Sequence, residues 1–407
     1  MLLPDVSPLA SRNFRLLYIG QAISGFGSAL TYVVLPVEMY RLTRSSVLVG
    51  MLGVAEFLPM LLVAFIGGPL ADRFDRRRLL IFTDSVMALC LAGLCGNAML
   101  PHPYVWPLFA AASALAALNA IHRPAIEAMT PQLVDPAKMT AVAALGSIRG
   151  TIAHIAGPGV AGWLAVQYGA ALVFGLDAAS FGASLAALIA MRTGPLTSGE
   201  DGAITWHTLI EGWRYALSRR DLLGTYLVDI NAMFFGMPNA LFPAFGDEFG
   251  AHNVGLLYAA GPLGAFLVSV TSRWAERVKR HGLAIAWAAG IWGLAIAVFG
   301  VAPKLWMALV CLTVAGGADM VSGIFRMTIW NQTIPARLRG RTAAIEMVSY
   351  LTGPYLGNAE AGLVAGAIGL RPSVALGGVL CMVGCAVVTA MLPEFRRYRA
   401  GEPGPAE

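Results

Sequence analysis

Long apolar stretches separated by short polar loops dominate the pattern along this chain. A helix that crosses a membrane needs about 20 predominantly apolar residues, and stretches of that length recur from end to end. The pattern predicts an all-α membrane protein with 12 transmembrane helices, so that both termini lie on one side. The expected spans lie near 16–36, 47–71, 79–100, 104–121, 140–168, 172–191, 222–245, 254–272, 283–302, 305–329, 342–368 and 373–392.

One long polar interruption, 193–221, divides these stretches into two groups of six. It opens with Pro195 and Gly199 and continues with Trp206, Trp213 and Leu217 at helical spacing. This predicts a cytoplasmic linker that carries an interfacial amphipathic helix. The expected organisation is an N-terminal six-helix bundle at 1–192, the linker at 193–221, a C-terminal six-helix bundle at 222–392 and a cytoplasmic tail at 393–407.

The two groups of stretches share residues at a constant offset of 200 positions. Transporters often contain internal structural repeats, and this offset holds across loops as well as helices. It therefore favours a parallel duplication of a six-helix unit. The matching pairs include Arg73 and Arg273, Gln132 and Gln332, Gly157 and Gly357, Gly162 and Gly362, and Gly169 and Gly369.

Composition and charge agree with a lipid-embedded protein. Hydrophobic residues make up 57% of the chain and charged residues only 13%, against about 25% charged in soluble domains. Lys and Arg in short loops are retained in the cytoplasm, which predicts cytoplasmic N- and C-termini in the inner membrane. The same placement explains the net charge of +5 without a nucleic-acid partner. The basic loop residues left on the outer side are Arg41, Arg44, Lys304 and Arg371.

No metal, cofactor or catalytic constellation is indicated. The 5 cysteines lie inside apolar stretches without histidines at metal-ligand spacing, so neither a zinc site nor disulfides are expected. No Gly-x-x-x-x-Gly-Lys-Ser/Thr loop supports direct use of ATP, which leaves an ion gradient as the energy source. We expect a monomer without cofactors and without enzymatic activity.

The loop after the 47–71 stretch reads Gly-Gly-Pro-Leu-Ala-Asp-Arg-Phe-Asp-Arg-Arg-Arg from Gly67 to Arg78. It resembles the signature loop of the major facilitator superfamily, with Asp75 where glycine is commonest. The resemblance implies that superfamily's fold, with two pseudo-symmetric six-helix bundles, and a gate in which Asp72 locks the cytoplasmic side. A positive-inside turn would explain the arginines but not their order. The implied gating residues are Gly68, Asp72, Arg73, Arg76 and Arg77.

A second motif, Gly157-Pro158 with Gly162, resembles the antiporter motif of the superfamily's exporters, although Ala161 replaces one glycine. Small residues let helices approach closely, so simple close packing is the alternative. Further segments, above all Gly255–Ala265, resemble the branch that contains the siderophore (enterobactin) exporter together with macrolide and other drug exporters. The resemblance implies export of a small organic solute.

Charges inside the apolar stretches are the candidates for substrate binding or proton coupling. Each costs about 2.5–3.5 kcal/mol at the bilayer centre even on the lenient insertion scale. The fold implied by the resemblance places the 222–245 and 305–329 stretches on the transport cavity, which favours the two aspartates there. Arg149 would bind an anionic substrate or neutralise a nearby acid. The candidates are Asp229, Asp319, Arg149, Glu56 and Arg326.

The alternative for the two aspartates is a structural pair with an arginine. Arg326 lies seven residues after Asp319, two turns along one face, and we expect the two to be too far apart for a direct pair within one helix.

The expected mechanism is alternating access, in which the two bundles rock and inward proton flow drives a solute outward. A siderophore or related hydrophilic metabolite is the first substrate class, a multidrug efflux role the second and a lipid flippase the third. A membrane enzyme or sensor is disfavoured because no catalytic constellation appears. The expected partners are the small-molecule substrate and the lipid bilayer.

Overall fold

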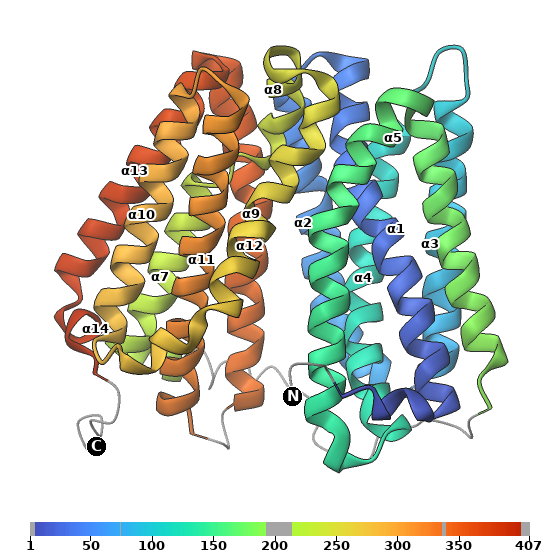
Figure 1. Ribbon diagram of the computed structural model, residues 1–407, viewed down its shortest axis with the longest axis horizontal. Helices are drawn as coiled ribbons and strands as arrows, with labels where there is room; N and C mark the ends of the chain where they lie inside the picture. Colours follow the sequence, from blue (N-terminus) through green and yellow to red (C-terminus); the bar gives the residue numbers. More distant parts are fainter. Residues whose placement is uncertain (1–4, 74, 193–213, 336–338, 400–407) are drawn as a thin grey trace. The chain divides into compact units, whose positions relative to one another are not determined.

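The computed structural model of the chain describes residues 5–73, 75–192, 214–335 and 339–399, with side chains described except in 64–73 and 339–351. The secondary structure of this described part is made of helices joined by short loops, without strands (Figure 1). Most of the predicted linker, 193–213, and the end of the predicted tail, 400–407, lie outside it.

The helices form two compact units. Unit 1 comprises 1–44, 54–203 and 250–259, and unit 2 comprises 45–53, 204–249 and 260–407. Two helices are therefore shared, because the first residues of α2 pack in unit 2 and the first residues of α9 pack in unit 1. We describe each unit separately.

Unit 1 is built on α1 packed along α5, with α3 against α5 and α4. Its helix α5 is 52 residues long, far more than a bilayer crossing requires. Gly169, with φ 83° and ψ 167°, interrupts it and separates two antiparallel arms (Figure 1). Its elements are η1 (Ser7–Ala10), α1 (Arg12–Thr43), α2 (Ser46–Arg73, from Val54), α3 (Arg76–Ala98), α4 (Trp106–Leu133), η2 (Pro136–Lys138), α5 (Met139–Ala190) and η4 (Ala251–Asn253).

Unit 2 packs α10 against α11 and α13, with α7 against α12 and α13. Gly369, with φ 96° and ψ 163°, turns the chain from α12 into α13 as Gly169 does within α5. The offset of 200 thus recurs in backbone geometry. The elements are α7 (Arg220–Phe235), η3 (Asn239–Leu241), α8 (Phe242–Phe249), α9 (Val254–Val270, from Ala260), η5 (Ser272–Arg277), α10 (His281–Val301), α11 (Leu305–Thr333), α12 (Arg339–Ile368), α13 (Leu370–Met391) and α14 (Pro393–Arg397).

Within the described residues, 8 helical segments are long and apolar enough to cross a membrane, and one of them contains both arms of α5. The predicted span 222–245 is wrong as a single helix. Helix α7 ends at Phe235 and α8 begins at Phe242, with Gly236 and Pro238 between them. A proline lacks the N–H that would continue the helix and disfavours helical backbone at the residue before it.

The predicted tail begins with a packed helix. Phe395 of α14 is fully buried, and its ring lies against Gly224 of α7 while its backbone lies against Gly282 of α10. A side chain at either glycine would overlap Phe395. The tail therefore adds to the core of unit 2, where Leu222, Ile285 and Phe395 share one hydrophobic cluster.

Candidate functional site

A cluster of three charged side chains lies inside unit 2. Arg326 on α11 forms an ion pair with Asp229 on α7 through Nη1 and Oδ1. Its Nη2 atom lies 3.5 Å from Oδ1 of Asp319, also on α11. The side chains of Arg326 and Asp229 are only 3% and 2% exposed, whereas that of Asp319 is 42% exposed. We call these three residues the charge triad.

The contact between Arg326 and Asp319 shows that the expectation that they are too far apart was wrong. Seven residues rise about 10 Å along a helix, but side chains lean toward the helix N-terminus, so the guanidinium of Arg326 reaches back toward Asp319. Gly323 lies between them, and a Cβ there would sit 3.9 Å from Nη2 of Arg326. A side chain at this position would therefore make only an ordinary van der Waals contact with the guanidinium.

The members of the charge triad differ in exposure, and we infer their roles from that difference. It combines two carboxylates with one guanidinium, so with both acids ionised it carries one uncompensated negative charge. Asp229 is buried together with Arg326, and removing either would leave an unpaired buried charge. Asp319 is the accessible member and its distance to Arg326 is longer. The arrangement can hold Arg326 through Asp229 while Asp319 exchanges a proton or contacts a solute.

Neighbouring contacts fix α7 and α11 around the triad. One turn from Arg326, Trp330 donates its Nε1–H to Thr225 Oγ1 of α7 at 2.9 Å. Its ring stacks on Tyr226 with centroids 5.4 Å apart. On α7, Asn231 donates to the Cys381 carbonyl of α13 at 2.9 Å. These polar contacts hold the helices that carry Asp229 and Arg326 in register.

Arg149, the candidate arginine of unit 1, projects from the first arm of α5. Its guanidinium lies 5.8 Å from the ring centroid of Tyr18 on α1, and Tyr18 in turn donates to the Leu145 carbonyl at 3.1 Å. No ion pair to Arg149 occurs among the described side chains. The described residues therefore give no support to a neutralising role, and Arg149 retains capacity for an anion.

Glu56, the remaining candidate acid, lies on α2 in unit 1. It is close enough to Tyr258 of α9 for an electrostatic interaction, and Tyr258 also packs edge-on against Tyr32 of α1 at 5.6 Å between centroids. The structure thus places Glu56 near Tyr258 in unit 1. It does not bring Glu56 together with Arg149, since no ion pair between them is present among the described side chains.

Two buried acids of unit 1, for which the sequence favours gating or structural roles, have partners that the sequence did not predict. Asp84 on α3 is fully buried, lies 2.8 Å from Nε2 of His122 on α4, and accepts a hydrogen bond from Ser184 at 2.7 Å. Asp177 accepts hydrogen bonds from Thr31 at 2.5 Å and Ser180 at 3.0 Å. The sequence feature that points to these sites is the presence of an acid within an apolar stretch, which holds for both aspartates. Their partners lie on other helices or one turn away.

The predicted gate is described only in part. Gly68, Asp72 and Arg73 lie outside the residues whose side chains are described, although α2 extends through Arg73. Arg76 donates to the Ala128 carbonyl of α4 at 2.7 Å. Arg77 donates to the carbonyls of Leu188 and Ile189, in the last turn of α5. These two arginines satisfy carbonyls near helix C-termini, where basic groups are stabilising.

The antiporter-like motif forms a close helix crossing. A Cβ at Gly162 would lie 2.8 Å from the Gly255 nitrogen of α9, and Gly255 packs in turn on the Pro158 carbonyl. Gly157 lies against Ala29 of α1. The motif thus brings α5 to within backbone contact of α9 inside unit 1.

The repeat forms the same crossing within unit 2. A Cβ at Gly362 of α12 would lie 3.0 Å from the Gly50 Cα of α2, and one at Gly50 would meet the Asn358 carbonyl. Gly362 and Asn358 stand 200 positions after Gly162 and Pro158. The crossing is therefore duplicated.

The described residues contain no cluster of three His, Cys, Asp or Glu side chains that could hold a metal ion.

Comparison with known proteins identifies a matching family and several similar proteins. Residues 4–401 match the major facilitator family described as transmembrane secretion effector. The enterobactin exporter EntS of Shigella boydii serotype 4 (strain Sb227) is 26% identical over 96% of this chain and 94% of its own length. EntS of Escherichia coli O1:K1 / APEC is likewise 26% identical over the same shares.

Among solved structures, the nucleoside transporter NupG has a TM-score of 0.77 at 13% identity and covers 93% of this chain and 98% of its own. A bacterial homolog of the human lysosomal transporter Spinster has a TM-score of 0.76 at 15% identity, over 99% of this chain and 100% of its own. At these identities the likeness establishes the fold, which is the 12-helix major facilitator fold.

Proposed function

Because the chain belongs to the transmembrane secretion effector family of the major facilitator superfamily, we propose that it exports a siderophore or a related hydrophilic metabolite in exchange for protons. The chain is a multi-pass membrane transporter and not an enzyme. The named activity of its curated relatives, enterobactin export, supports the substrate class. The proposed mechanism is alternating access driven by the proton gradient across the inner membrane.

The charge triad is the observation that carries the proposal. Its uncompensated negative charge is offset when one carboxylate takes up a proton. Asp319 is the member that can do so, because Asp229 is buried with Arg326 while Asp319 remains accessible. In the proposed cycle Asp319 receives a proton from outside and releases it to the cytoplasm after the site has changed sides. The structure thus supports Asp319 over Asp229, which the apolar pattern alone left as equal candidates.

Arg149 supplies the proposed contact to an anionic substrate. Its guanidinium has an aromatic contact with Tyr18 rather than a carboxylate partner among the described side chains. An arginine presents several N–H donors in one plane and binds carboxylates or phosphates in a bidentate manner. We assign it to substrate recognition, Asp319 to coupling and Asp229 to holding Arg326.

The proposal extends to topology and gating. The termini and the 193–221 linker face the cytoplasm, where Asp72 and the neighbouring arginines close the gate, and the chain acts as a monomer. These assignments rest on the distribution of Lys and Arg and on the signature loop from Gly67 to Arg78.

The coupling role is tested in proteoliposomes loaded with substrate and energised by a pH gradient. The Asp319→Asn variant should exchange substrate down its gradient but lose uphill export, because it can no longer carry the proton. Glu276→Gln on η5 removes an exposed carboxylate outside the triad and serves as the matched control. Full gradient-driven export by Asp319→Asn would show the coupling site to be wrong, and Glu56 would be the next candidate.

The substrate class is tested by comparing metabolites secreted by a deletion strain and its parent, under iron limitation and iron repletion. A siderophore that is depleted from the medium of the deletion strain only under iron limitation is the expected result. Unchanged siderophore secretion with increased sensitivity to drugs would instead assign the chain to multidrug efflux.

A further inference from the structure

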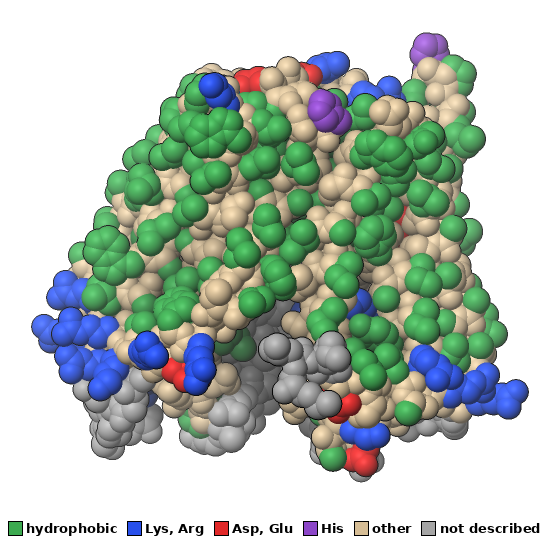
Figure 2. All heavy atoms as spheres, viewed as in Figure 1, with side chains coloured by type: hydrophobic (Ala, Val, Ile, Leu, Met, Phe, Trp, Pro, Cys, Tyr) green, Lys and Arg blue, Asp and Glu red, His purple; other side chains and the backbone are tan. Residues whose placement is uncertain are grey.

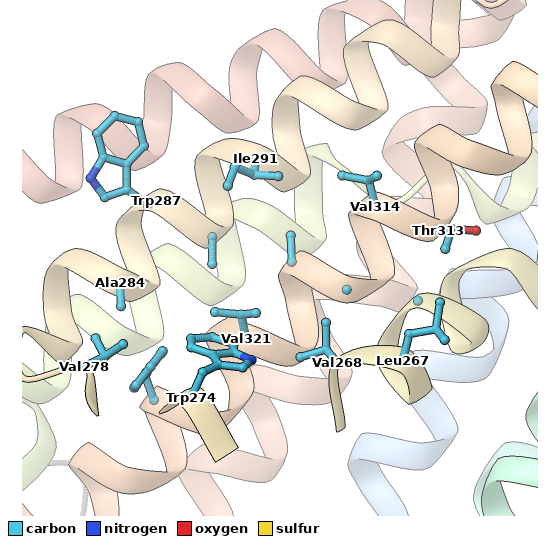
Figure 3. Close-up of a pocket in the computed structure, with 15 residues that line it drawn as sticks. Leu267, Val268, Trp274, Val278, Ala284, Trp287, Ile291, Thr313, Val314 and Val321 are labelled. Atoms are coloured by element: carbon cyan, nitrogen blue, oxygen red, sulfur yellow. The ribbon is translucent and has the colours of Figure 1, made fainter. Parts of the chain in front are cut away.

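A lateral groove runs along the outside of unit 2 between α9, η5, α10 and α11. Its cavity volume is about 530 Å³, which lies within the range of roughly 300–1,000 Å³ typical of small-molecule sites. Thr313 is the one residue lining it that carries a polar side-chain group other than an indole N–H. Figure 3 shows Val268 of α9, Trp274 of η5 and Val321 of α11 converging in it.

The groove is open because its floor is made of small residues. Gly264 of α9 lies against the Thr313 carbonyl and the Gly317 nitrogen of α11, so these two backbones touch. Small residues from α10 and α11 continue the floor, while large apolar side chains stand at its sides. The small residues are Gly264, Ala284, Ala288, Gly317 and Ala318.

The groove has the length of one leaflet of a bilayer. Along α11 it extends from Thr313 to Phe325, which is about 18 Å at 1.5 Å per residue. The hydrocarbon core of a bilayer is about 30 Å thick, so the groove covers about half of it. An extended acyl chain of one leaflet fits this length and this apolar lining.

Aromatic and basic residues mark one end of the groove. Trp274 packs on Phe325 with centroids 6.1 Å apart, and tryptophan prefers the membrane interface. Directly around it Arg273, Arg277, Lys279 and Arg280 are all exposed, and none forms an ion pair among the described side chains. Glu276 is the single acid in this segment.

The positive charge at this end of the groove favours an anionic ligand. In Figure 2, Lys and Arg side chains gather at the end of unit 2 that carries α14, whereas apolar side chains cover its flank. Helix α14 lies beside the start of α10, next to the basic segment 273–280. Basic clusters at the membrane boundary attract anionic lipids by about 1 kcal/mol per residue.

We propose that the lateral groove binds one acyl chain of an anionic phospholipid whose headgroup is held by the basic segment 273–280. This site is separate from the proposed substrate site and does not depend on the identity of the exported solute. The groove residues of α11, such as Val314, Val321 and Phe325, lie on the side of the helix opposite Asp319 and Arg326 at 3.6 residues per turn. A bound lipid thus contacts the helix that carries two members of the charge triad.

Native mass spectrometry of the purified protein tests the headgroup. It is mixed with phosphatidylglycerol or phosphatidylethanolamine of identical acyl chains, and retained lipid is counted. The double variant Arg273→Gln, Arg277→Gln should weaken phosphatidylglycerol retention roughly 30-fold, or about 2 kcal/mol at about 1.4 kcal/mol per tenfold. Lysines at both positions should restore it. Arg12→Gln with Arg15→Gln, two exposed arginines of unit 1 that do not line the groove, is the matched control.

The acyl chain is tested separately with a bulky residue at the rim of the groove. Val314→Trp should displace the retained lipid, whereas Val310→Trp, one turn away on α11 and outside the groove, should not. Equal retention by these two variants, or by the two double glutamine variants, would overturn the proposal. A dimer that Val314→Trp disrupts would also overturn it, by assigning the groove to a second copy of the chain.

Discussion

Replacing Asp229 with asparagine tests whether the two acids of the charge triad have different tasks. The change keeps the shape of the side chain but removes the charge that compensates Arg326. Both partners of this pair are almost completely buried, with side-chain exposures of 2% and 3%. Breaking a buried ion pair by removing one partner costs about 3–5 kcal/mol, because the other charge stays buried without compensation.

The corresponding change at Asp319 should be much milder. Its side chain is 42% exposed and lies 3.5 Å from the guanidinium, and pairs of such exposure contribute about 0–1 kcal/mol. Asp229→Asn should therefore lower the free energy of unfolding by several kcal/mol and Asp319→Asn by less than about one. The order of the two losses, rather than their size, is the outcome that matters.

The cysteines of the chain provide the assay. Cys311, Cys381 and Cys385 are buried in unit 2, whereas Cys90 and Cys95 lie in unit 1. In a background of Cys90→Ala and Cys95→Ala, a thiol-reactive dye reports the unfolding of unit 2 during a denaturant titration. The shift of the midpoint then gives the stability of each variant.

A double variant separates charge from shape. Asp229→Asn combined with Arg326→Gln removes both charges and leaves two amides that can hydrogen-bond each other. It should recover most of the stability lost in Asp229→Asn, because replacing a buried pair as a whole is far less costly than breaking it. Equal losses for Asp229→Asn and Asp319→Asn, or no recovery in the double variant, would refute the division of tasks.

Three further variants test the remaining sites. In transport assays, Gly162→Ala should reduce export at least tenfold, because the added Cβ would meet the backbone of α9. Gly159→Ala should transport normally, because the space around Gly159 is open in the described structure. Arg149→Gln should weaken binding of an anionic substrate at least about tenfold in equilibrium binding measurements, because a charge-assisted hydrogen bond is lost. Its binding of a cationic drug should not change. Tyr18→Phe keeps the ring beneath the guanidinium and should bind both ligands normally. Asp72→Asn should insert normally but export roughly 5- to 30-fold more slowly, since about 1–2 kcal/mol at a helix end is lost in one state only. Wild-type export rates would exclude the gate.

Hydrophobic patterning predicted most of the helices because the bilayer requires long apolar segments with satisfied backbones. The reversal in α5 was also foreseen, as a gap between 168 and 172, and the structure places Gly169 in it. Patterning missed the break at Gly236 and Pro238, since the residues on both sides stay apolar. It also missed α14, because one buried ring, that of Phe395, carries that contact.

The candidate charges could be found from sequence, but their pairing could not. A charge inside an apolar stretch is costly wherever it points, so Asp229, Asp319 and Arg326 were visible as candidates. Which of them meet depends on the rotation of α7 and α11 about their axes and on the direction of the side chains. The pair of Asp84 and His122 was missed for the same reason, because it joins α3 to α4.

The duplication separates what the two halves share from what each half does. The shared features are backbone features: Gly169 and Gly369 turn the chain with nearly the same φ and ψ, and Gly162 and Gly362 form matching close crossings. Such positions cannot accept a side chain without displacing a neighbouring backbone or straining the turn.

The charges are not shared. At the same offset of 200, Asp229 corresponds to Ala29 and Asp319 to Asn119, while Asp84 corresponds to Ala284. Each half thus has its own buried carboxylate on a common helical framework: Asp84 lies beside His122 in unit 1, and Asp229 forms an ion pair with Arg326 in unit 2. A framework constrained by helix crossings tolerates charge substitutions at positions that face the interior of a unit. Differences in substrate or coupling ion between relatives should therefore be found at these unshared charges and not at the repeated glycines.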